Sequence, residues 1–225
     1  MIDAATLAIN LATVERRIAE ACARVGRARE QVQLVAVTKR HPPELVRAAF
    51  AAGLRHFGEN YAQELRDKHE ALSDCAGLRW HAIGPVQTKN AKYLAKAAHV
   101  FHALERLEVA QELSRRRTGA ALECFVEVNV EGEASKAGLS PDAVPAFLEQ
   151  VRTLPGLQVV GLMTMPPFSD DPQASRPAFQ RLAALGKALG LPSLSMGTTG
   201  DFEVAIEEGA THVRVGTALF GERPA

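Results

Sequence analysis

Lys39 is the residue of this sequence whose position most clearly suggests chemistry. It ends the stretch Leu34 to Lys39, which has the apolar, β-branched character of a buried parallel strand, and Arg40 and His41 follow it. A lysine that emerges from a buried strand end can lose hydration, lower its pKa and act as a nucleophilic amine toward an aldehyde. Most lysines at strand ends are simply solvated, so this role depends on what the rest of the chain brings near.

Two segments near the C-terminus carry residues that suit a phosphate group. Met196 to Asp201 is small and hydroxyl-bearing, includes Thr199, and opens directly into a short predicted helix. Farther on, Gly216 lets a backbone N–H approach an anion and Thr217 adds a hydroxyl. Taken alone, each segment is more often a turn with a helix cap, and only their position relative to Lys39 favours a phosphate site.

Eight predicted strands, each separated from the next by a helix, must position these residues. They cover residues 34–39, 56–60, 79–85, 99–105, 122–130, 159–165, 193–198 and 212–221. Strict alternation predicts a parallel sheet, and eight units predict a single (β/α)8 barrel of the TIM type. We expect a single domain over 1–225, with an N-terminal helix in 1–26 and the barrel in 34–221. An open doubly wound sheet is the alternative, although no GxGxxG motif follows the first strand.

Closure of the barrel would place the first strand beside the eighth, and the eighth beside the seventh. Lys39 would then lie next to the two phosphate-suited segments, and an amine beside a phosphate site is what pyridoxal 5'-phosphate requires. Arg214 alternates with Val213 and Val215, so its side chain would face the barrel mouth. A guanidinium facing the pyridine nitrogen would keep that nitrogen unprotonated and the cofactor a poor electron sink. A salt bridge with a carboxylate is the alternative for Arg214.

Other polar residues allow two interpretations each. Asn60, at the end of the second strand, could hydrogen-bond a ring substituent or cap the following helix. His81 could act as an acid or base, although a histidine beside Trp80 is more often a buried structural residue. Glu127 shares a strand face with Asn129, but no second carboxylate can be assigned to it. The seven histidines lack the spacing of metal ligands, so we predict no metal.

Composition argues against several classes of function. Lys and Arg number 26, as do Asp and Glu, and only 5% of residues are aromatic, so we expect no nucleic acid as partner. No leader-like start and no long apolar run is present, so we expect no membrane association. The three cysteines, Cys22, Cys75 and Cys124, are widely spaced without a CxxC pair. A reducing, cytoplasmic location is the expectation.

The N-terminal segment predicts an amphipathic helix over residues 4–25. Its apolar residues recur at steps of three and four, as Leu7, Leu11, Val14 and Ile18 show. A two-stranded coiled coil would use the same spacing, but three heptads are few. We therefore expect this helix to pack on its own domain and the protein to be a monomer.

Seven blocks occur in a fixed order along the chain: LVAVTK at 34–39, FGENYAQE at 57–64, WHAIGPVQ at 80–87, SKAG at 135–138, GLMTMPPF at 161–168, SMGTTGD at 195–201 and VRVGTALFG at 213–221. In these blocks the sequence resembles the pyridoxal-phosphate homeostasis protein family, the YggS/PROSC group, over nearly its full length. The resemblance implies a barrel similar to that of alanine racemase and other fold-type III enzymes that use pyridoxal phosphate.

The resemblance also implies the arrangement of the site. The cofactor would be held as a Schiff base on the lysine that is Lys39 here, with the arginine matching Arg214 near the pyridine ring. The phosphate would be held by the two final loops, around Ser195, Thr199, Gly216 and Thr217. Family members bind and supply the vitamin B6 cofactor without an established reaction, so apo-enzymes that depend on pyridoxal phosphate are candidate transient recipients.

Two enzymatic alternatives stay open at this point. A racemase-like enzyme would need a second catalytic base, and racemases of this fold add a C-terminal β-domain, whereas this sequence ends at Ala225 soon after its last predicted strand. We therefore expect a carrier without catalytic residues. A class I aldolase would trap a substrate carbonyl on lysine without a cofactor, but barrel aldolases usually place that lysine on a later strand.

Several positions depart from the family pattern. Thr198 and Thr199 stand where Met-Ser is usual, and Lys89 and Asn90 are transposed relative to the family. Ala82 replaces an aromatic residue, and Glu105 replaces an aspartate. Thr199 keeps the hydroxyl of the usual serine and adds a methyl group that alters the phosphate contact, and the resemblance implies no role for Lys89.

Overall fold

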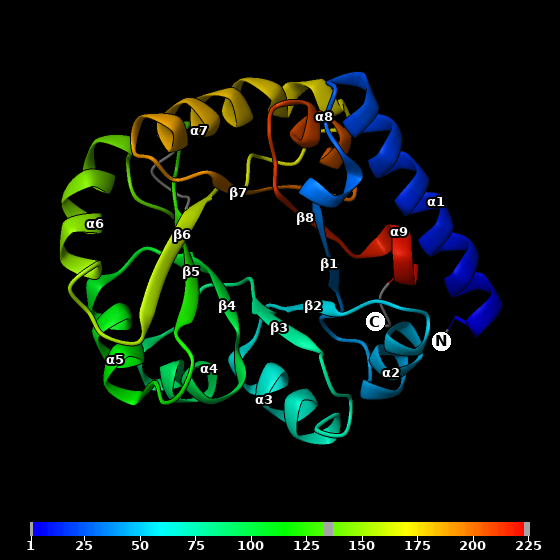
Figure 1. Ribbon diagram of the computed structural model, residues 1–225, viewed down its shortest axis with the longest axis horizontal. Helices are drawn as coiled ribbons and strands as arrows, with labels where there is room; N and C mark the ends of the chain where they lie inside the picture. Colours follow the sequence, from blue (N-terminus) through cyan, green and yellow to red (C-terminus); the bar gives the residue numbers. More distant parts are fainter. Residues whose placement is uncertain (1, 133–136, 223–225) are drawn as a thin grey trace.

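Eight short apolar strands pair in chain order and close on themselves in the computed structural model, which describes residues 2–132 and 137–222 (Figure 1). They are β1 (Gln33–Val37), β2 (His56–Glu59), β3 (Arg79–Ala82), β4 (Val100–Leu104), β5 (Leu122–Glu127), β6 (Leu157–Met163), β7 (Ser193–Thr198) and β8 (His212–Val215). All neighbours are parallel, and β1 pairs with β8 to complete the ring. The predicted (β/α)8 barrel is therefore confirmed, and the open-sheet alternative is wrong.

Helices surround the barrel and connect successive strands (Figure 1). They are α2 (Pro43–Ala51), α3 (Ala62–Ala71), α4 (Ala91–Ala97), α5 (Leu107–Arg116), α6 (Val144–Val151), α7 (Arg176–Ala188) and α8 (Phe202–Glu207), with α1 (Ala4–Arg24) before the first strand and α9 (Thr217–Phe220) after the last. Across residues 2–132 and 137–222, none of the helices combines the length and hydrophobicity needed to cross a bilayer.

The N-terminal helix α1 begins where the Asp3 side chain accepts a hydrogen bond from the Thr6 backbone N–H. Its apolar stripe, including Leu7, Val14 and Ile18, is buried. The helix lies along α8 and α9, as Figure 1 shows at the edge of the barrel. The stripe is therefore covered within its own chain, as predicted, and no coiled-coil partner is needed to bury it.

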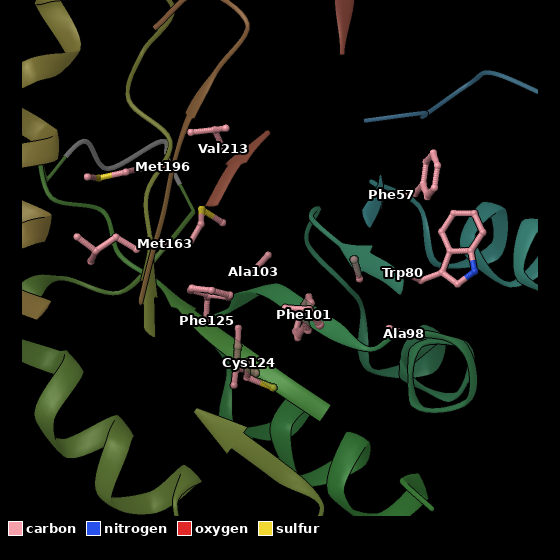
Figure 2. Close-up of a cluster of buried hydrophobic side chains, with 14 of the residues drawn as sticks. Phe57, Trp80, Ala98, Phe101, Ala103, Cys124, Phe125, Met163, Met196 and Val213 are labelled. Atoms are coloured by element: carbon pink, nitrogen blue, oxygen red, sulfur yellow. The ribbon is translucent and has the colours of Figure 1, made fainter. Parts of the chain in front are cut away.

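Apolar side chains fill the space between strands and helices, and Figure 2 shows part of this core. Phe57 on β2 and Trp80 on β3 lie side by side with ring centroids 6.1 Å apart, and both are buried. Side chains alternate across a barrel wall, so the neighbour of Trp80, His81, points into the interior. There Phe125 stacks on His102 at a centroid distance of 4.7 Å. The interior thus contains imidazoles as well as hydrocarbon.

Several strand ends differ from the sequence-based prediction: the third strand ends at Ala82 rather than at 85, and the fifth ends at Glu127 rather than at 130. The differences in the eighth and first strands concern the site. The eighth strand was predicted to continue to Gly221, but it stops at Val215, and the backbone N–H groups of Leu219 and Phe220 donate to the Gly216 carbonyl to form α9. The first strand stops at Val37, so Lys39 lies in the turn beyond the strand rather than at its last position. Of the SKAG block, Ser135 and Lys136 lie outside the described residues.

Candidate functional site

The end of β1 lies against the end of β8 at the C-terminal face of the barrel. In the register of these strands Val35 is opposite Arg214 and Ala36 is opposite Val215. A Cβ atom added at Gly216 would lie 3.3 Å from the Val37 carbonyl oxygen, so the two backbones approach closely just past the strands. Lys39, which is half-buried, follows two residues later. The structure therefore brings the Lys39 turn beside the Gly216 segment, as barrel closure predicted.

The loops after β7 and β8 meet at one polar contact. The Gly216 backbone N–H donates to the Thr199 hydroxyl, with 3.3 Å between nitrogen and oxygen. Thr198 instead turns to Asp201, whose Oδ1 accepts its backbone N–H at 2.7 Å and its hydroxyl at 3.1 Å. Thr217 is the first residue of α9. The backbone N–H of Gly216 thus lies beside the Thr199 hydroxyl, and Thr217, next in the chain, adds a second hydroxyl. Groups of this kind suit an anion.

Gly197 allows β7 to run directly against the helix that follows it. Its φ is +90°, in the left-handed region, and a Cβ there would lie 2.5 Å from the Cβ of Ala205 on α8. Any larger residue would push α8 away from the strand. The glycine therefore fixes the position of the loop that carries Thr199.

A cavity of about 270 Å³ adjoins these loops. Gly197, Thr198, Asp201 and Arg214 line it on one side, and the loop from Met165 to Ser169 lines it on the other. A volume of this size exceeds what a single water molecule fills and suits a small organic ligand. Of the predicted cofactor-binding residues, all within the described ranges, only Arg214 lines this cavity, while Lys39, Gly216 and the hydroxyl of Thr199 belong to the neighbouring turns and are not part of its lining.

Arg214 points into the barrel, as its alternation with two valines predicted. Nη1 donates to the Ser195 hydroxyl at 2.5 Å and Nη2 donates to the Thr164 carbonyl at 3.1 Å. In the part of the chain that the structure describes, no carboxylate forms an ion pair with it, so the salt-bridge alternative has no support there. Burial lowers the pKa of Arg214 to about 10, opposed by the charge of Glu127. The guanidinium is still protonated at neutral pH.

Ser195 and Asn60 occupy different places from the phosphate-suited loops. Ser195 is fully buried on β7, where its hydroxyl contacts His102 Nδ1 at 2.7 Å besides Arg214. It lies inside the barrel and not beside Thr199 and Gly216. Asn60 is half-buried in the loop after β2. The helix cap of α3 is Tyr61, so the capping interpretation of Asn60 is wrong.

Sequence reasoning missed a buried ionic group beneath the Lys39 turn, which we call the lysine-side network: Thr38, Glu59, Glu64 and Lys68. Lys68 Nζ donates to Glu59 Oε1 at 2.6 Å, to Glu64 Oε1 at 2.8 Å and to the Thr38 carbonyl at 2.7 Å. The Thr38 hydroxyl also donates to Glu59 Oε1, at 2.6 Å. Glu64 and Lys68 are four residues apart, which is the spacing of an ordinary exposed pair on a helix, and nothing in the sequence indicates that Lys68 is buried.

The lysine-side network sets the backbone that carries Lys39. The Arg40 N–H donates to Glu64 Oε1 at 2.6 Å, and the Arg40 φ of +63° turns the chain sharply. The Thr38 carbonyl also accepts from the His41 N–H at 3.0 Å. The residues on both sides of Lys39 are therefore tied to one buried cation, which fixes where the Lys39 side chain starts.

Two buried carboxyls near the site have raised pKa values. Burial raises the pKa of Glu59 to about 7, against the opposing charge of Lys68. Burial, followed by the charge of Glu105, raises the pKa of Glu127 to about 7, and Arg214 opposes this shift. Each carboxyl has a buried Oε2 atom without a hydrogen-bond partner in the structure. Glu105, the departure from the family pattern, accepts the Gly138 N–H at 2.5 Å.

His81 lies fully buried inside the barrel and has the structural role that its position beside Trp80 favoured. Its Nε2 contacts His56 Nδ1 at 2.9 Å and its Nδ1 contacts His102 Nε2 at 2.8 Å. Burial holds the pKa of His81 well below its usual value. Within the described ranges, no group of three or more His, Cys, Asp and Glu side chains has the arrangement to hold a metal ion.

Comparison with known proteins places this geometry in context. The family model described as alanine racemase, N-terminal domain, matches residues 9–224. The pyridoxal phosphate homeostasis protein of Pseudomonas aeruginosa is 46% identical over 222 residues, which cover 97% of this chain and 96% of that protein. The structure of PipY from Synechococcus elongatus with PLP bound is 34% identical, covering 91% of this chain and 100% of that one, with a TM-score of 0.77.

A more distant similarity concerns the fold alone. The alanine racemase of Corynebacterium glutamicum is 19% identical, and its structure superposes with a TM-score of 0.69. The match covers 99% of this chain but 62% of that one. The barrel is therefore shared with an enzyme that has substantial further structure.

Proposed function

The chain belongs to the pyridoxal phosphate homeostasis protein family, and from this premise we propose that it binds pyridoxal 5'-phosphate on Lys39 and serves intracellular supply of that cofactor. The observation that carries the proposal is the meeting of the Lys39 turn with Gly216 and Thr199 at the point where the barrel closes. The turn that carries the Lys39 amine would then lie beside groups that can hold an anion, which is the pair of features that the cofactor's aldehyde and phosphate need.

Each group of the site has a distinct role in this proposal. Lys39 Nζ would attack the aldehyde carbon, and a C=N bond would form with loss of one water, giving a Schiff base. The Gly216 N–H and the hydroxyls of Thr199 and Thr217 would hold the phosphate. The lysine-side network keeps the Lys39 turn in one conformation, which reduces the ordering cost of binding.

Arg214 accounts for the proposed lack of turnover. The cofactor supplies an electron sink when its pyridine nitrogen is protonated. A buried guanidinium facing that nitrogen opposes its protonation, because two adjacent cations repel. Binding without catalysis is therefore the proposed role, and racemase-like activity is the alternative.

Absorption spectroscopy tests the binding proposal. Purified protein titrated with pyridoxal phosphate should develop a visible band that borohydride abolishes. Lys39→Ala should remove this band, whereas Lys96→Ala, at an exposed lysine on α4, should keep it. A band of unchanged intensity in Lys39→Ala would contradict the assignment.

Two further measurements address turnover and transfer. The loaded protein is incubated with single amino acid enantiomers, and chiral chromatography should show no inversion; measurable inversion would favour the racemase-like alternative. Mixing the loaded protein with an apo-enzyme that depends on pyridoxal phosphate should restore that enzyme's activity. Recovery no faster than with an equal concentration of dissociated cofactor would argue against direct transfer.

The oligomeric state is part of the proposal. We infer a monomer because the apolar stripe of α1 is already covered by α8 and α9 in the same chain. Light scattering at several protein concentrations should give a mass near 24.2 kDa, that of one chain. A stable mass of twice that value would overturn this inference.

A further inference from the structure

A continuous line of hydrogen bonds crosses the barrel interior, and we call it the histidine chain: Arg214, Ser195, His102, His81 and His56, from β8, β7, β4, β3 and β2. The successive distances are 2.5 Å from Arg214 Nη1 to Ser195 Oγ and 2.7 Å from Ser195 Oγ to His102 Nδ1. The line continues with 2.8 Å from His102 Nε2 to His81 Nδ1 and 2.9 Å from His81 Nε2 to His56 Nδ1. It joins the proposed cofactor site to the start of β2, at the opposite end of the barrel.

The chemistry of the first member fixes the direction of the whole line. A guanidinium only donates hydrogen bonds, so the Ser195 oxygen accepts from Arg214. Ser195 has one proton of its own, and its other partner in the structure is His102 Nδ1. If that nitrogen carried a proton, the buried Ser195 O–H would have no acceptor, which is costly. The Ser195 O–H therefore donates to an unprotonated His102 Nδ1.

The same reasoning determines which nitrogen carries the proton in each of the three imidazoles. A neutral imidazole has one donor and one acceptor nitrogen, so His102 carries its proton on Nε2 and donates to His81 Nδ1. His81 in turn donates from Nε2 to His56 Nδ1. Burial lowers the pKa of His102 and His81 well below the usual value and that of His56 to about 4, so all three are neutral at neutral pH. Every bond of the histidine chain then points away from Arg214.

We propose that the histidine chain positions Arg214 and stabilises its buried charge, with Ser195 and His102 as positioning residues for the cofactor site. Each member presents its acceptor, the negative end of its dipole, toward the guanidinium, and aligned hydrogen bonds polarise and strengthen one another. Arg214 is 5% exposed and hydrogen-bonds only to neutral oxygens in the described chain. The charges of Glu127 and Asp201 also favour the protonated guanidinium, but neither carboxylate hydrogen-bonds to it, so oriented dipoles make its direct contacts.

His212 provides a matched control within the same cluster. Its ring lies 6.1 Å from that of His102 and 5.0 Å from that of Phe125, between centroids. Its Nδ1 contacts the Thr211 hydroxyl at 2.9 Å, so it packs against the histidine chain without belonging to it. Replacing His212 with Phe changes the packing of the cluster but leaves each bond of the chain in place.

Nitrogen-15 NMR of the full-length protein without cofactor tests the direction of the chain. His56, His81 and His102 should each show an unprotonated Nδ1 and a protonated Nε2. An Nδ1-protonated form of His102 or His81 would overturn the proposal, and this measurement needs no variant.

In Ser195→Ala, the exchange of Arg214 guanidinium protons should speed up at least about tenfold, since a hydrogen bond to a charged group is lost. His212→Phe should leave that rate unchanged; equal acceleration in both variants would contradict a specific role of the chain.

The role at the cofactor site rests on the proposed function and has its own readout. With cofactor bound, Ser195→Ala should raise the pH midpoint at which the visible band changes. A displaced guanidinium opposes protonation of the cofactor less than one held close to it. An unchanged midpoint would overturn the positioning role. If no band forms in the wild type but the tautomers are as stated, the proposed function fails while the direction of the histidine chain stands.

Discussion

Two buried polar groups of side chains flank the proposed site, and they balance charge in opposite ways. Under the Lys39 turn, the lysine-side network pairs a cation directly with carboxylates at 2.6 and 2.8 Å. Beside Arg214, the histidine chain offers only neutral acceptors. The first group holds a backbone turn and the second holds a side chain.

The difference determines how each region should respond to change. Removing one member of a buried ion pair leaves an uncompensated charge, which is more costly than losing a neutral hydrogen bond. Buried carboxyls with raised pKa values favour low pH, whereas buried neutral histidines favour high pH. The effects of substitutions and of pH on the free energy of unfolding should therefore differ between the two regions.

The largest effect is expected at the centre of the lysine-side network. Lys68→Met leaves Glu59 and Glu64 without their cation and should destabilise the protein by about 3–5 kcal/mol in chemical denaturation. Lys96→Met, at an exposed lysine, should change the free energy of unfolding by less than about 0.5 kcal/mol. The double variant Lys68→Met/Glu59→Gln should regain part of the loss, and a double variant less stable than Lys68→Met would contradict the pairing.

Glu59 should make the protein less stable as pH rises. Its pKa of about 7 in the folded state lies above the ordinary 4.5, so the stabilisation is complete below pH 4.5 and is lost as pH rises toward 7. The loss is about 3 kcal/mol over that range. In Glu59→Gln, denaturation curves at pH 4.5 and 7 should lack this decline. A decline equal to that of the wild type would show that Glu59 does not titrate in this range.

His212 should make the protein less stable as pH falls, which is the opposite of the effect of Glu59. Its pKa of about 4 in the folded state lies below the ordinary 6.5, so its contribution is complete above pH 6.5 and is lost as pH falls toward 4. The wild type should lose about 2 kcal/mol between pH 7 and 5 through this group. His212→Phe should lose correspondingly less over the same interval, and an identical loss in both proteins would contradict the neutral state of His212.

The smallest effect is expected at an exposed ion pair, which sets the baseline for the comparison. Arg16 and Glu20 lie one turn apart on α1, 2.8 Å between nitrogen and oxygen, with side chains 63% and 52% exposed. Arg16→Ala should change the free energy of unfolding by less than about 0.5 kcal/mol. A larger change would mean that exposed pairs matter here as well and would weaken the contrast with Lys68.

Local pattern was enough to predict the barrel and the direction of Arg214. The periodicity of strands and helices can be recognised from neighbouring residues, and the alternation around Arg214 places its side chain on the inner face. The short helix α9 was missed because its four residues, Thr217–Phe220, are too few to show a helical period and read as a continuation of the apolar strand.

The two polar groups could not be predicted because their members come together only on barrel closure. Alternation places His81 and His102 inside, but it does not say which atoms meet, since that depends on the stagger of strands around the barrel. Lys68 looks like a surface residue on a polar helix, and only the packing of α3 against β2 buries it. Ser195 likewise could not be separated from the phosphate-suited loop by sequence alone.

The most direct test of the central claim is the location of the reduced adduct. The loaded protein is treated with borohydride, digested, and its peptides are analysed by mass spectrometry. We predict a phosphopyridoxyl group on Lys39 and on no other lysine at stoichiometric level. A protein that takes up no cofactor, or one whose adduct lies mainly elsewhere, would contradict the assignment of Lys39 as the residue that holds pyridoxal phosphate.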